Sequence, residues 1–157
     1  GNDTVAFNTN VFDITVINAE NIIGSANFDR ITIGNMSGST TITAGVGADE
    51  IFASAASDNF RFISIADSGA AADTIHGFNA ASDTFTLSGI DIAGGHIEFV
   101  DGDPLVGGGQ ASAHLLNSGP GNDMLQIDTD GDGNGDMDIS LQDLQGTLHN
   151  SNFQITI

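Results

Sequence analysis

The sequence contains no cysteine, tryptophan, tyrosine or lysine. Without cysteine it can form neither disulfides nor thiolate metal sites, so a stable extracellular fold would need another source of stability. Only two basic residues, Arg30 and Arg61, oppose 21 acidic residues, and the formal net charge is −19. Such a chain is excluded as a nucleic-acid binder, because binding to phosphates depends on basic side chains that release counterions. Anionic membrane surfaces are excluded for the same reason.

Long hydrophobic runs are also missing, since none approaches the roughly 18 residues that a membrane-spanning helix needs. The 157 residues nevertheless include 39% hydrophobic residues, which is enough for a packed core. This length predicts one domain, or two small ones that share a core. The sequence begins at Gly1 without a signal-peptide pattern, which predicts a fragment or a processed form.

The acidic residues are almost all aspartate, with 18 Asp against 3 Glu. Aspartate together with 21 glycines favours turns rather than solvated helices. Carboxylates that cluster in turns supply the hard oxygen ligands that Ca²⁺ prefers. The alternative is an acidic surface that serves only solubility or salt tolerance.

Helical periodicity is almost absent, and short runs of alternating or β-branched residues dominate instead. Each run is bounded by Gly, Asn, Asp or Ser, which predicts an all-β chain of many short strands. The runs lie at residues 5–7, 13–17, 30–33, 40–43, 60–63, 84–87, 96–100, 124–127, 137–141 and 153–157. Residues 110–117 and 141–150 are candidates for short helical turns.

A nine-residue phrase recurs in the first half of the chain. Residues 44–52 and 53–61 are consecutive copies that align Asp49 with Asp58, and residues 24–32 place Asp29 in the same position. Residues 1–5 and 119–125 repeat the tail of the phrase. In each copy a turn of small residues precedes the aspartate, and an apolar residue two places later is expected to point inward from a short strand. Stacked turns of this kind could hold a cation between neighbouring coils.

The phrase resembles the calcium-binding nonapeptide G-G-x-G-x-D-x-U-x of RTX (repeats-in-toxin) proteins. Residues 44–52 match it with only the first glycine changed, to Ala44. Residues 1–62 therefore resemble a degenerate RTX β-roll, which is a parallel β-solenoid. Copies that have lost their glycines are candidates for structural coils without metal. The resemblance implies Ca²⁺ as cofactor, with ligands from Asp29, Gly45, Gly47 and Asp49. Asp29 and Asp49 are expected to form a pair, because their separation of 20 residues is close to two nonapeptides.

The second half resembles the C-terminal domain that follows the roll in serralysin-type secreted metalloproteases. The resemblance lies in the order and spacing of residues 73–78, 82–91, 125–141 and 152–155. It implies that residues 63–157 form a β-sandwich-like cap, continuous with the roll, that is not catalytic. It also implies a secreted protein, exported by type I secretion machinery that reads a C-terminal signal. Asn152 stands where the family tends to have an acidic residue.

The densest acidic segment lies at residues 128–136. Its carboxylates occupy positions 1, 3, 5 and 9 of a loop resembling that of an EF-hand, and they belong to Asp128, Asp130, Asp132 and Asp136. Position 12 is Ile139 rather than glutamate, and the flanks are predicted strands, so a complete EF-hand is not expected. The segment predicts a calcium-binding loop between two strands, and the alternative is a solvated hairpin loop.

The remaining aspartates have weaker patterns. Asp67 and Asp73 flank a small-residue loop and are candidates for a site where the roll meets the cap. Asp58, Asp83 and Asp91 are expected to cap turns by accepting backbone N–H hydrogen bonds.

No catalytic constellation is present in the sequence. It has no H-E-x-x-H zinc motif, no G-x-S-x-G elbow and no cysteine nucleophile. We therefore favour a non-catalytic, calcium-binding module of a secreted protein that folds on calcium binding after export. An alternative is the terminal structural or adhesive module of a surface-layer protein or large adhesin, which assembles through calcium. The chain could also be the tail of an exoenzyme whose activity lies in another part.

Overall fold

The structure is a computed structural model, and it describes residues 2–34, 38–102, 104–117 and 121–157. The partial repeats at residues 1–5 and 119–125 thus fall partly outside the described residues. Strands make up the regular structure, together with three single-turn 3-10 helices: η1 (Ile65–Asp67), η2 (Ala93–Gly95) and η3 (Asn150–Asn152). Among the described residues, no helix is long and apolar enough to cross a membrane.

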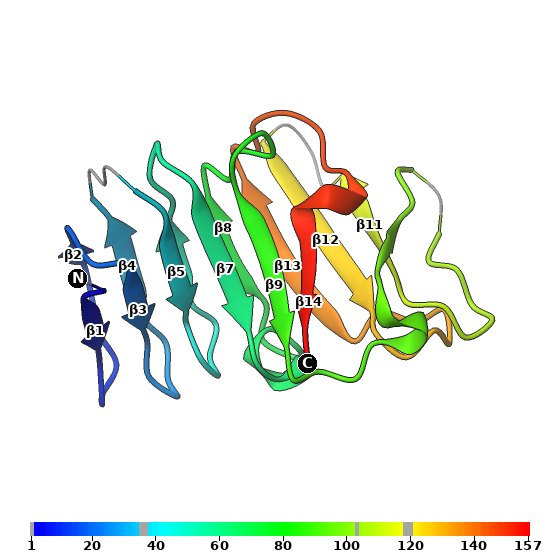
Figure 1. The fold of residues 1–157 in the computed structure, drawn as a ribbon, viewed down its shortest axis with the longest axis horizontal. Coiled ribbons are helices and arrows are strands. Elements are labelled where there is room, and N and C mark those ends of the chain that lie inside the picture. Colours follow the sequence, from blue (N-terminus) through cyan, green and yellow to red (C-terminus); the bar gives the residue numbers. More distant parts are fainter. Residues whose placement is uncertain (1, 35–37, 103, 118–120) are drawn as a thin grey trace.

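The strands form two sheets (Figure 1). The six-stranded sheet contains, in spatial order, β1 (Thr4–Ala6), β3 (Asn21–Ile23), β5 (Thr40–Thr43), β7 (Asp58–Phe62), β9 (Thr84–Ser88) and β14 (Phe153–Thr156). The eight-stranded sheet contains β10 (Glu98–Phe99), β11 (Ser112–Asn117), β12 (Asn122–Asp128), β13 (Met137–Gln142), β8 (Asp73–His76), β6 (Glu50–Phe52), β4 (Arg30–Ile33) and β2 (Ile14–Val16).

Consecutive strands from β1 to β9 alternate between the two sheets, and each strand from β1 to β7 pairs in parallel with the strand two places later. Two strands and two turns therefore make one coil. The registers of Thr4 with Asn21 and of Asn59 with Thr84 give coils of 17 to 25 residues. This geometry confirms the predicted all-β fold with a parallel β-roll. We number the coils from the N-terminus, so that coil 1 contains β1 and β2.

The roll continues into a mixed C-terminal part. β13 pairs in parallel with β8 and antiparallel with β12, which in turn pairs antiparallel with β11. The last strand, β14, returns to the six-stranded sheet and pairs in parallel with β9. Both sheets and the apolar core run across residue 62 without a break, so the division at 62/63 has no counterpart in the strand pairing.

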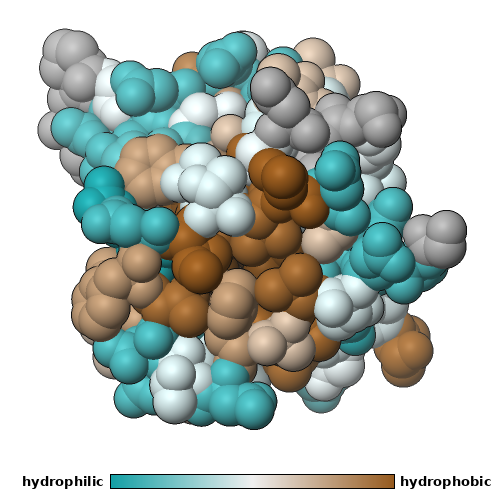
Figure 2. Space-filling model, turned by 90° about the vertical axis from the view of Figure 1, so that its left-hand side faces the viewer, coloured by the Kyte–Doolittle hydropathy of each residue, from teal (hydrophilic) through white to brown (hydrophobic). Residues whose placement is uncertain are grey.

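The core of the roll contains two columns of apolar side chains, one beneath each sheet. The register aligns Val5, Ile22, Ile42, Phe60 and Phe85 in the six-stranded sheet. It aligns Ile14, Ile31, Ile51, Ile75 and Leu141 in the eight-stranded sheet. Every member is at most 2% exposed except the two in coil 1, Val5 and Ile14, which are only half-buried. Figure 2 shows an apolar patch in the middle of this end of the molecule, framed by hydrophilic residues. The inward-pointing apolar residue of the repeat therefore forms the core of the roll.

The two candidate helical turns are wrong. Most of residues 110–117 form β11, because the alternating side chains of this segment pair across β12. In residues 141–150 the strand β13 continues to Gln142, and the nearest helical turn, η3, begins only at Asn150. The short strands β3 and β6 were not among the predicted runs of strand residues, and they lie between strands that were predicted.

Candidate metal sites

Three aspartates form a ladder along the turns that lead into the eight-stranded sheet. Asp29, Asp49 and Asp73 are aligned by strand register and are at most 1% exposed. The N–H of Asp29 donates to Oδ1 of Asp49 at 2.7 Å, and the N–H of Asp49 donates to Oδ1 of Asp73 at 2.9 Å. The structure thus brings the predicted pair Asp29 and Asp49 together and adds Asp73 as a third rung. We call these residues the aspartate ladder.

The turns beside the ladder stack so closely that they need glycine. Gly45 has a φ of 101°, and a Cβ placed on it would lie 2.0 Å from the carbonyl oxygen of Ser25 in the preceding coil. A Cβ on Gly47 would lie 2.9 Å from Oδ1 of Asp49 and 3.0 Å from the carbonyl oxygen of Asn27. Backbone oxygens of one turn therefore lie next to the glycines of the following turn, close to the aspartate ladder.

Two carboxylate oxygens of the ladder are buried without a partner. Oδ2 of Asp49 and Oδ2 of Asp73 have no hydrogen-bond donor among the described residues. Burial raises the pKa of Asp49 to about 7, and the nearby charges of Asp29 and Asp67 add to that effect. Burial likewise raises the pKa of Asp73 to about 8. A buried carboxylate oxygen of this kind needs a proton or a cation to be stable.

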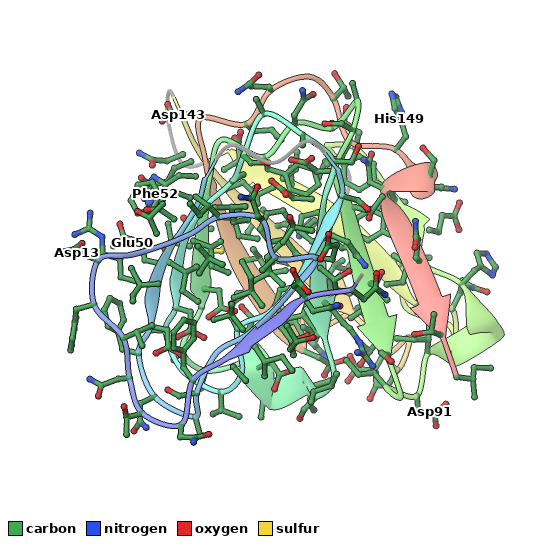
Figure 3. The ribbon with its side chains drawn as sticks, turned by 60° about the vertical axis from the view of Figure 1, so that its left-hand side comes forward. Asp13, Glu50, Phe52, Asp91, Asp143 and His149 are labelled. Atoms are coloured by element: carbon green, nitrogen blue, oxygen red, sulfur yellow. The ribbon has the colours of Figure 1, made fainter. Side chains whose placement is uncertain are left out.

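The basic side chains of the chain do not supply that cation. Arg30 pairs with Asp13 at 3.1 Å and with Glu50 at 2.9 Å, and its guanidinium carbon lies 5.3 Å from the ring centre of Phe52. Asp13, Glu50 and Phe52 accordingly lie on the same side of the molecule (Figure 3). Arg61 donates instead to the hydroxyl of Ser88 on the six-stranded sheet. Because the sequence has no other arginine and no lysine, no arginine or lysine side chain offsets the charge of the ladder.

A second pair of aspartates lies in the turns on the opposite side of the roll. Oδ1 of Asp83 accepts the N–H of Asp58 at 3.0 Å, and Oδ2 of Asp83 accepts the N–H of Asn79. Oδ2 of Asp58 accepts the N–H of Ser54 at 2.6 Å. Burial raises the pKa of both carboxyls. Asp58 and Asp83 are thus turn-capping residues, as predicted, whereas Asp91 is exposed.

Asp67 does not lie with Asp73 in the aspartate ladder, although the two residues flank the same loop in the sequence. Its Oδ2 accepts the N–H groups of Ile63 and Ser64, while the Ser64 hydroxyl accepts the N–H of Ala66. This capping box closes η1, and the charge of the carboxylate adds to the raised pKa values of Asp49 and Asp73. Sequence reasoning placed Asp73 with Asp67, but register makes Asp73 part of the ladder. The sequence does contain a signal for this placement, because Ile75 follows Asp73 by two positions just as Ile51 follows Asp49.

The acidic segment 128–136 is the hairpin loop between β12 and β13, so its flanks are strands, as predicted. Both oxygens of the fully buried Asp128 accept backbone N–H groups at 2.7 Å, from Gly131 and Gly133. Oδ2 of Asp136 accepts the N–H and the hydroxyl of Thr129. One oxygen each from Asp128, Asp130 and Asp136 lies within 4.8 Å of the others. The fourth predicted ligand, Asp132, is exposed and turned toward Asn134.

The charges of this loop affect one another. The N–H of Asp132 lowers the pKa of Asp130, but desolvation and the charges of Asp132, Asp136 and Asp128 outweigh it, and the net effect raises that pKa. Hydrogen bonds from the side chain and backbone of Asn134 lower the pKa of Asp132. The loop thus holds three carboxylates together against their repulsion, and a divalent cation would relieve that repulsion.

Comparison with known families identifies one match. The family described as "Peptidase M10 serralysin C terminal" matches residues 2–153 of the chain. No curated protein matches the sequence. The family match covers the roll, the aspartate ladder and the acidic hairpin loop together.

Proposed function

Because this chain belongs to the serralysin C-terminal family, we propose that it is a calcium-stabilised, non-catalytic module of a secreted protein. The family supports an RTX-type C-terminal module, a secreted location and calcium as the cation. We further propose that the module folds on calcium binding after export through type I secretion machinery. Any enzymatic activity would then belong to another part of the parent protein.

The observation that carries this proposal is the buried charge of the aspartate ladder. Asp49 and Asp73 each bury one carboxylate oxygen without a hydrogen-bond donor among the described residues. Both arginines of the chain are engaged elsewhere. Carboxylate and carbonyl oxygens are the donor set that Ca²⁺ prefers, so the residues present fit this ion. Asp49 and Asp73 would hold it, with carbonyl oxygens of the turns at Gly45 and Gly47. Asp29, the other predicted ligand of the ladder, would contribute less, because its two oxygens already accept the backbone N–H groups of Val11 and Ser25.

The hairpin loop 128–136 is a second candidate for the same ion. Asp128, Asp130 and Asp136 would hold it there, because their carboxylates already converge. Asp128 contributes less than the sequence pattern suggests, since both its oxygens already accept backbone N–H groups. Asp132 is not part of this proposed set. At either place the ion would supply positive charge that offsets the repulsion among buried or clustered carboxylates.

Calcium would thereby couple folding to location. Where calcium is scarce, the repulsion of the −19 net charge disfavours the compact chain and keeps it competent for export. Extracellular calcium-binding modules have dissociation constants of about 10⁻⁴–10⁻³ M, which suits calcium at about millimolar concentration. At calcium concentrations one to ten times the dissociation constant, binding to the folded state alone adds about 0.4–1.4 kcal/mol of stability for each independent site.

Thermal unfolding with calcium and with EGTA tests the proposal. Far-UV circular dichroism is the suitable probe, because the chain has no tryptophan. We expect the midpoint to rise with calcium, and more so than with an equal ionic strength of sodium chloride. An unchanged midpoint would refute calcium stabilisation. Light scattering in the same titration distinguishes the calcium-stabilised module from the structural or adhesive alternative, because a surface-layer module would self-associate as calcium is added.

A further inference from the structure

The hairpin loop between β12 and β13 contains three places in succession where a glycine follows an aspartate or an asparagine. Glycine has no side chain to hinder its backbone nitrogen from approaching the carbonyl group of the preceding side chain. Such pairs are therefore where a five-membered succinimide ring forms most readily. The pairs are Asp130 with Gly131, Asp132 with Gly133, and Asn134 with Gly135, and the last is the only Asn-Gly pair in the sequence. The loop lies beyond the lower ends of β12 and β13 in Figure 1.

Hydrogen bonds to Asp128 protect the first two pairs. Oδ1 of this fully buried side chain accepts the N–H of Gly131, and Oδ2 accepts the N–H of Gly133, both at 2.7 Å. A backbone nitrogen that attacks the preceding side chain must give up its proton and turn toward that side chain, so each of these bonds has to break first. Hydrogen bonds to an ionised carboxylate are among the stronger ones in proteins. We therefore expect ring formation at Asp130 and Asp132 to be slow in the folded chain.

The third pair lacks this protection. Asn134 and Gly135 are both exposed, and the N–H of Gly135 has no hydrogen-bond acceptor among the described residues. A Cβ placed on Gly135 would meet nothing closer than 3.5 Å, so this peptide has room to turn. The side-chain amide of Asn134 donates only to Oδ1 of Asp132, at 3.0 Å and at the surface. The fold thus leaves the nitrogen of Gly135 free to reach the side chain of Asn134.

We propose that Asn134 is a site of spontaneous modification, and that Asp128 confines succinimide chemistry in this loop to that residue. The backbone nitrogen of Gly135 bonds to Cγ of Asn134, the bond from Cγ to Nδ2 breaks, and Nδ2 leaves as ammonia with the proton from the N–H of Gly135. Water then opens the ring. Breaking the new bond to Cγ gives aspartate, and breaking the bond to the backbone carbonyl carbon gives isoaspartate. Water is the only co-reactant.

Both products disturb the loop, because the modified residue lies between two anchored ones. The N–H of Gly133 is held by Asp128, and the N–H of Asp136 donates to the carbonyl oxygen of Ile127 at 2.8 Å. Isoaspartate adds a backbone carbon between these anchors. Either product also replaces the amide that donates to Asp132 by a carboxylate, which repels it. We therefore expect the modified chain to exchange the amide protons of Gly133 and Asp136 faster than the unmodified chain.

The test compares the three pairs within one chain. The protein is incubated at pH 8 in calcium, where circular dichroism verifies that it is folded, and in parallel in urea. Peptide mapping by mass spectrometry locates deamidation, and labelling with an isoaspartyl methyltransferase locates isoaspartate. In the folded chain we expect modification at Asn134 and none at Asp130 or Asp132, whereas in urea all three should react. Asn134→Gln should abolish the mass change, because glutamine would have to close a larger ring.

Asp128→Ala tests the protection directly. It frees the N–H groups of Gly131 and Gly133, and we expect isoaspartate at Asp130 and Asp132 to form at least about tenfold faster. Phe78→Ala is the control for general destabilisation, because it leaves Asp128 in place; both variants are compared where circular dichroism shows them folded. An Asn134 that reacts in urea but not in the folded chain would overturn the proposal. Equal modification of all three pairs in the folded chain, or no increase in Asp128→Ala, would do so too.

Discussion

The backbone N–H of Asp29 donates a hydrogen bond of 2.7 Å to Oδ1 of Asp49, which lies 20 residues later and one coil further along the roll. One carboxylate thus serves two purposes. Oδ1 joins neighbouring turns, whereas Oδ2 is buried without a donor among the described residues. This division of roles separates the structural part of the aspartate ladder from the part that we assign to calcium, and mutations can distinguish them.

Substitutions at Asp49 should separate the two roles. Asp49→Asn retains Oδ1 for the N–H of Asp29 but removes the charge, so we expect little loss of stability in EGTA and a smaller rise in the unfolding midpoint with calcium. Asp49→Ala removes the acceptor as well and should cost about 1–3 kcal/mol in both conditions. Thermal unfolding by circular dichroism measures both effects. The control Asp143→Asn changes an exposed aspartate and should leave both quantities unchanged; an equal response would argue against a ladder site.

The stability of the calcium-free protein should fall as pH rises. Because burial raises the pKa of Asp49 to about 7 and that of Asp73 to about 8, the folded state retains protons that the unfolded state loses near pH 4. The extra stability is therefore complete below about pH 4 and is lost as pH rises toward 7 and 8. Urea midpoints in EGTA at pH 5 and pH 8 measure this loss.

Two controls assign that pH dependence. The double variant Asp49→Asn and Asp73→Asn should remove most of the loss of stability between pH 5 and pH 8. If the loss came instead from repulsion among the other acidic residues, it would persist in this variant. Calcium should also reduce it, because a bound cation favours the charged carboxylates. A wild-type chain that in EGTA is as stable at pH 8 as at pH 5 would show that the two buried carboxyls do not retain protons.

The tight stacking of the turns can be tested at Gly45. Gly45→Ala would place a Cβ 2.0 Å from the carbonyl oxygen of Ser25 and would also strain a residue with a φ of 101°. Gly77→Ala is a matched control, because Gly77 has a φ of 75° but open space around the added Cβ. We expect the control to lower the free energy of unfolding by about 1–2 kcal/mol, and Gly45→Ala to lower it by about 1–3 kcal/mol more. Equal urea midpoints for the two variants would contradict the stacking geometry.

The sequence predicts most of the roll because its repeat couples a turn, an aspartate and an inward apolar residue in a fixed order. The alignment of Asp29 with Asp49 follows from that order even though their spacing exceeds two nonapeptides. The strand β11 was not predicted, because it is held by pairing with β12, whose paired residues lie 6 to 16 positions further along the chain and outside the local pattern. The buried Oδ2 atoms of Asp49 and Asp73 depend on three stacked coils at once, so no local pattern contains them.

The acidic hairpin loop illustrates the same limit. Its spacing predicted four equivalent ligands, but a loop is shaped by its backbone hydrogen bonds as well as by its charges. Asp128→Ala should cost about 1–3 kcal/mol for each of the two N–H groups it leaves without an acceptor, at Gly131 and Gly133. Asp132→Ala, at an exposed position, should change stability by less than about 0.5 kcal/mol. Urea denaturation of both variants in EGTA measures the difference, and similar costs would contradict the assigned roles.

The roll and the cap should unfold as one cooperative unit. Phe78 stacks on Phe85 at 4.4 Å, and Phe85 contacts both Phe60 of the roll and Phe153 of the last strand. The strands on either side of residue 62 also pair directly, β6 with β8 and β7 with β9. Phe78→Ala should therefore cost about 3–5 kcal/mol and shift a single transition, without splitting it.

Circular dichroism measures that transition for the whole chain, and amide exchange measures it separately in the strands of the roll and of the cap. A matched variant, Phe12→Ala, removes an aromatic ring that is 64% exposed and should change the midpoint far less. A fragment of residues 1–62 should not fold alone, because it lacks β8 and β9, the C-terminal partners of β6 and β7. If Phe78→Ala produced two separate transitions, or if the fragment folded, the predicted division into domains at 62/63 would be a physical boundary.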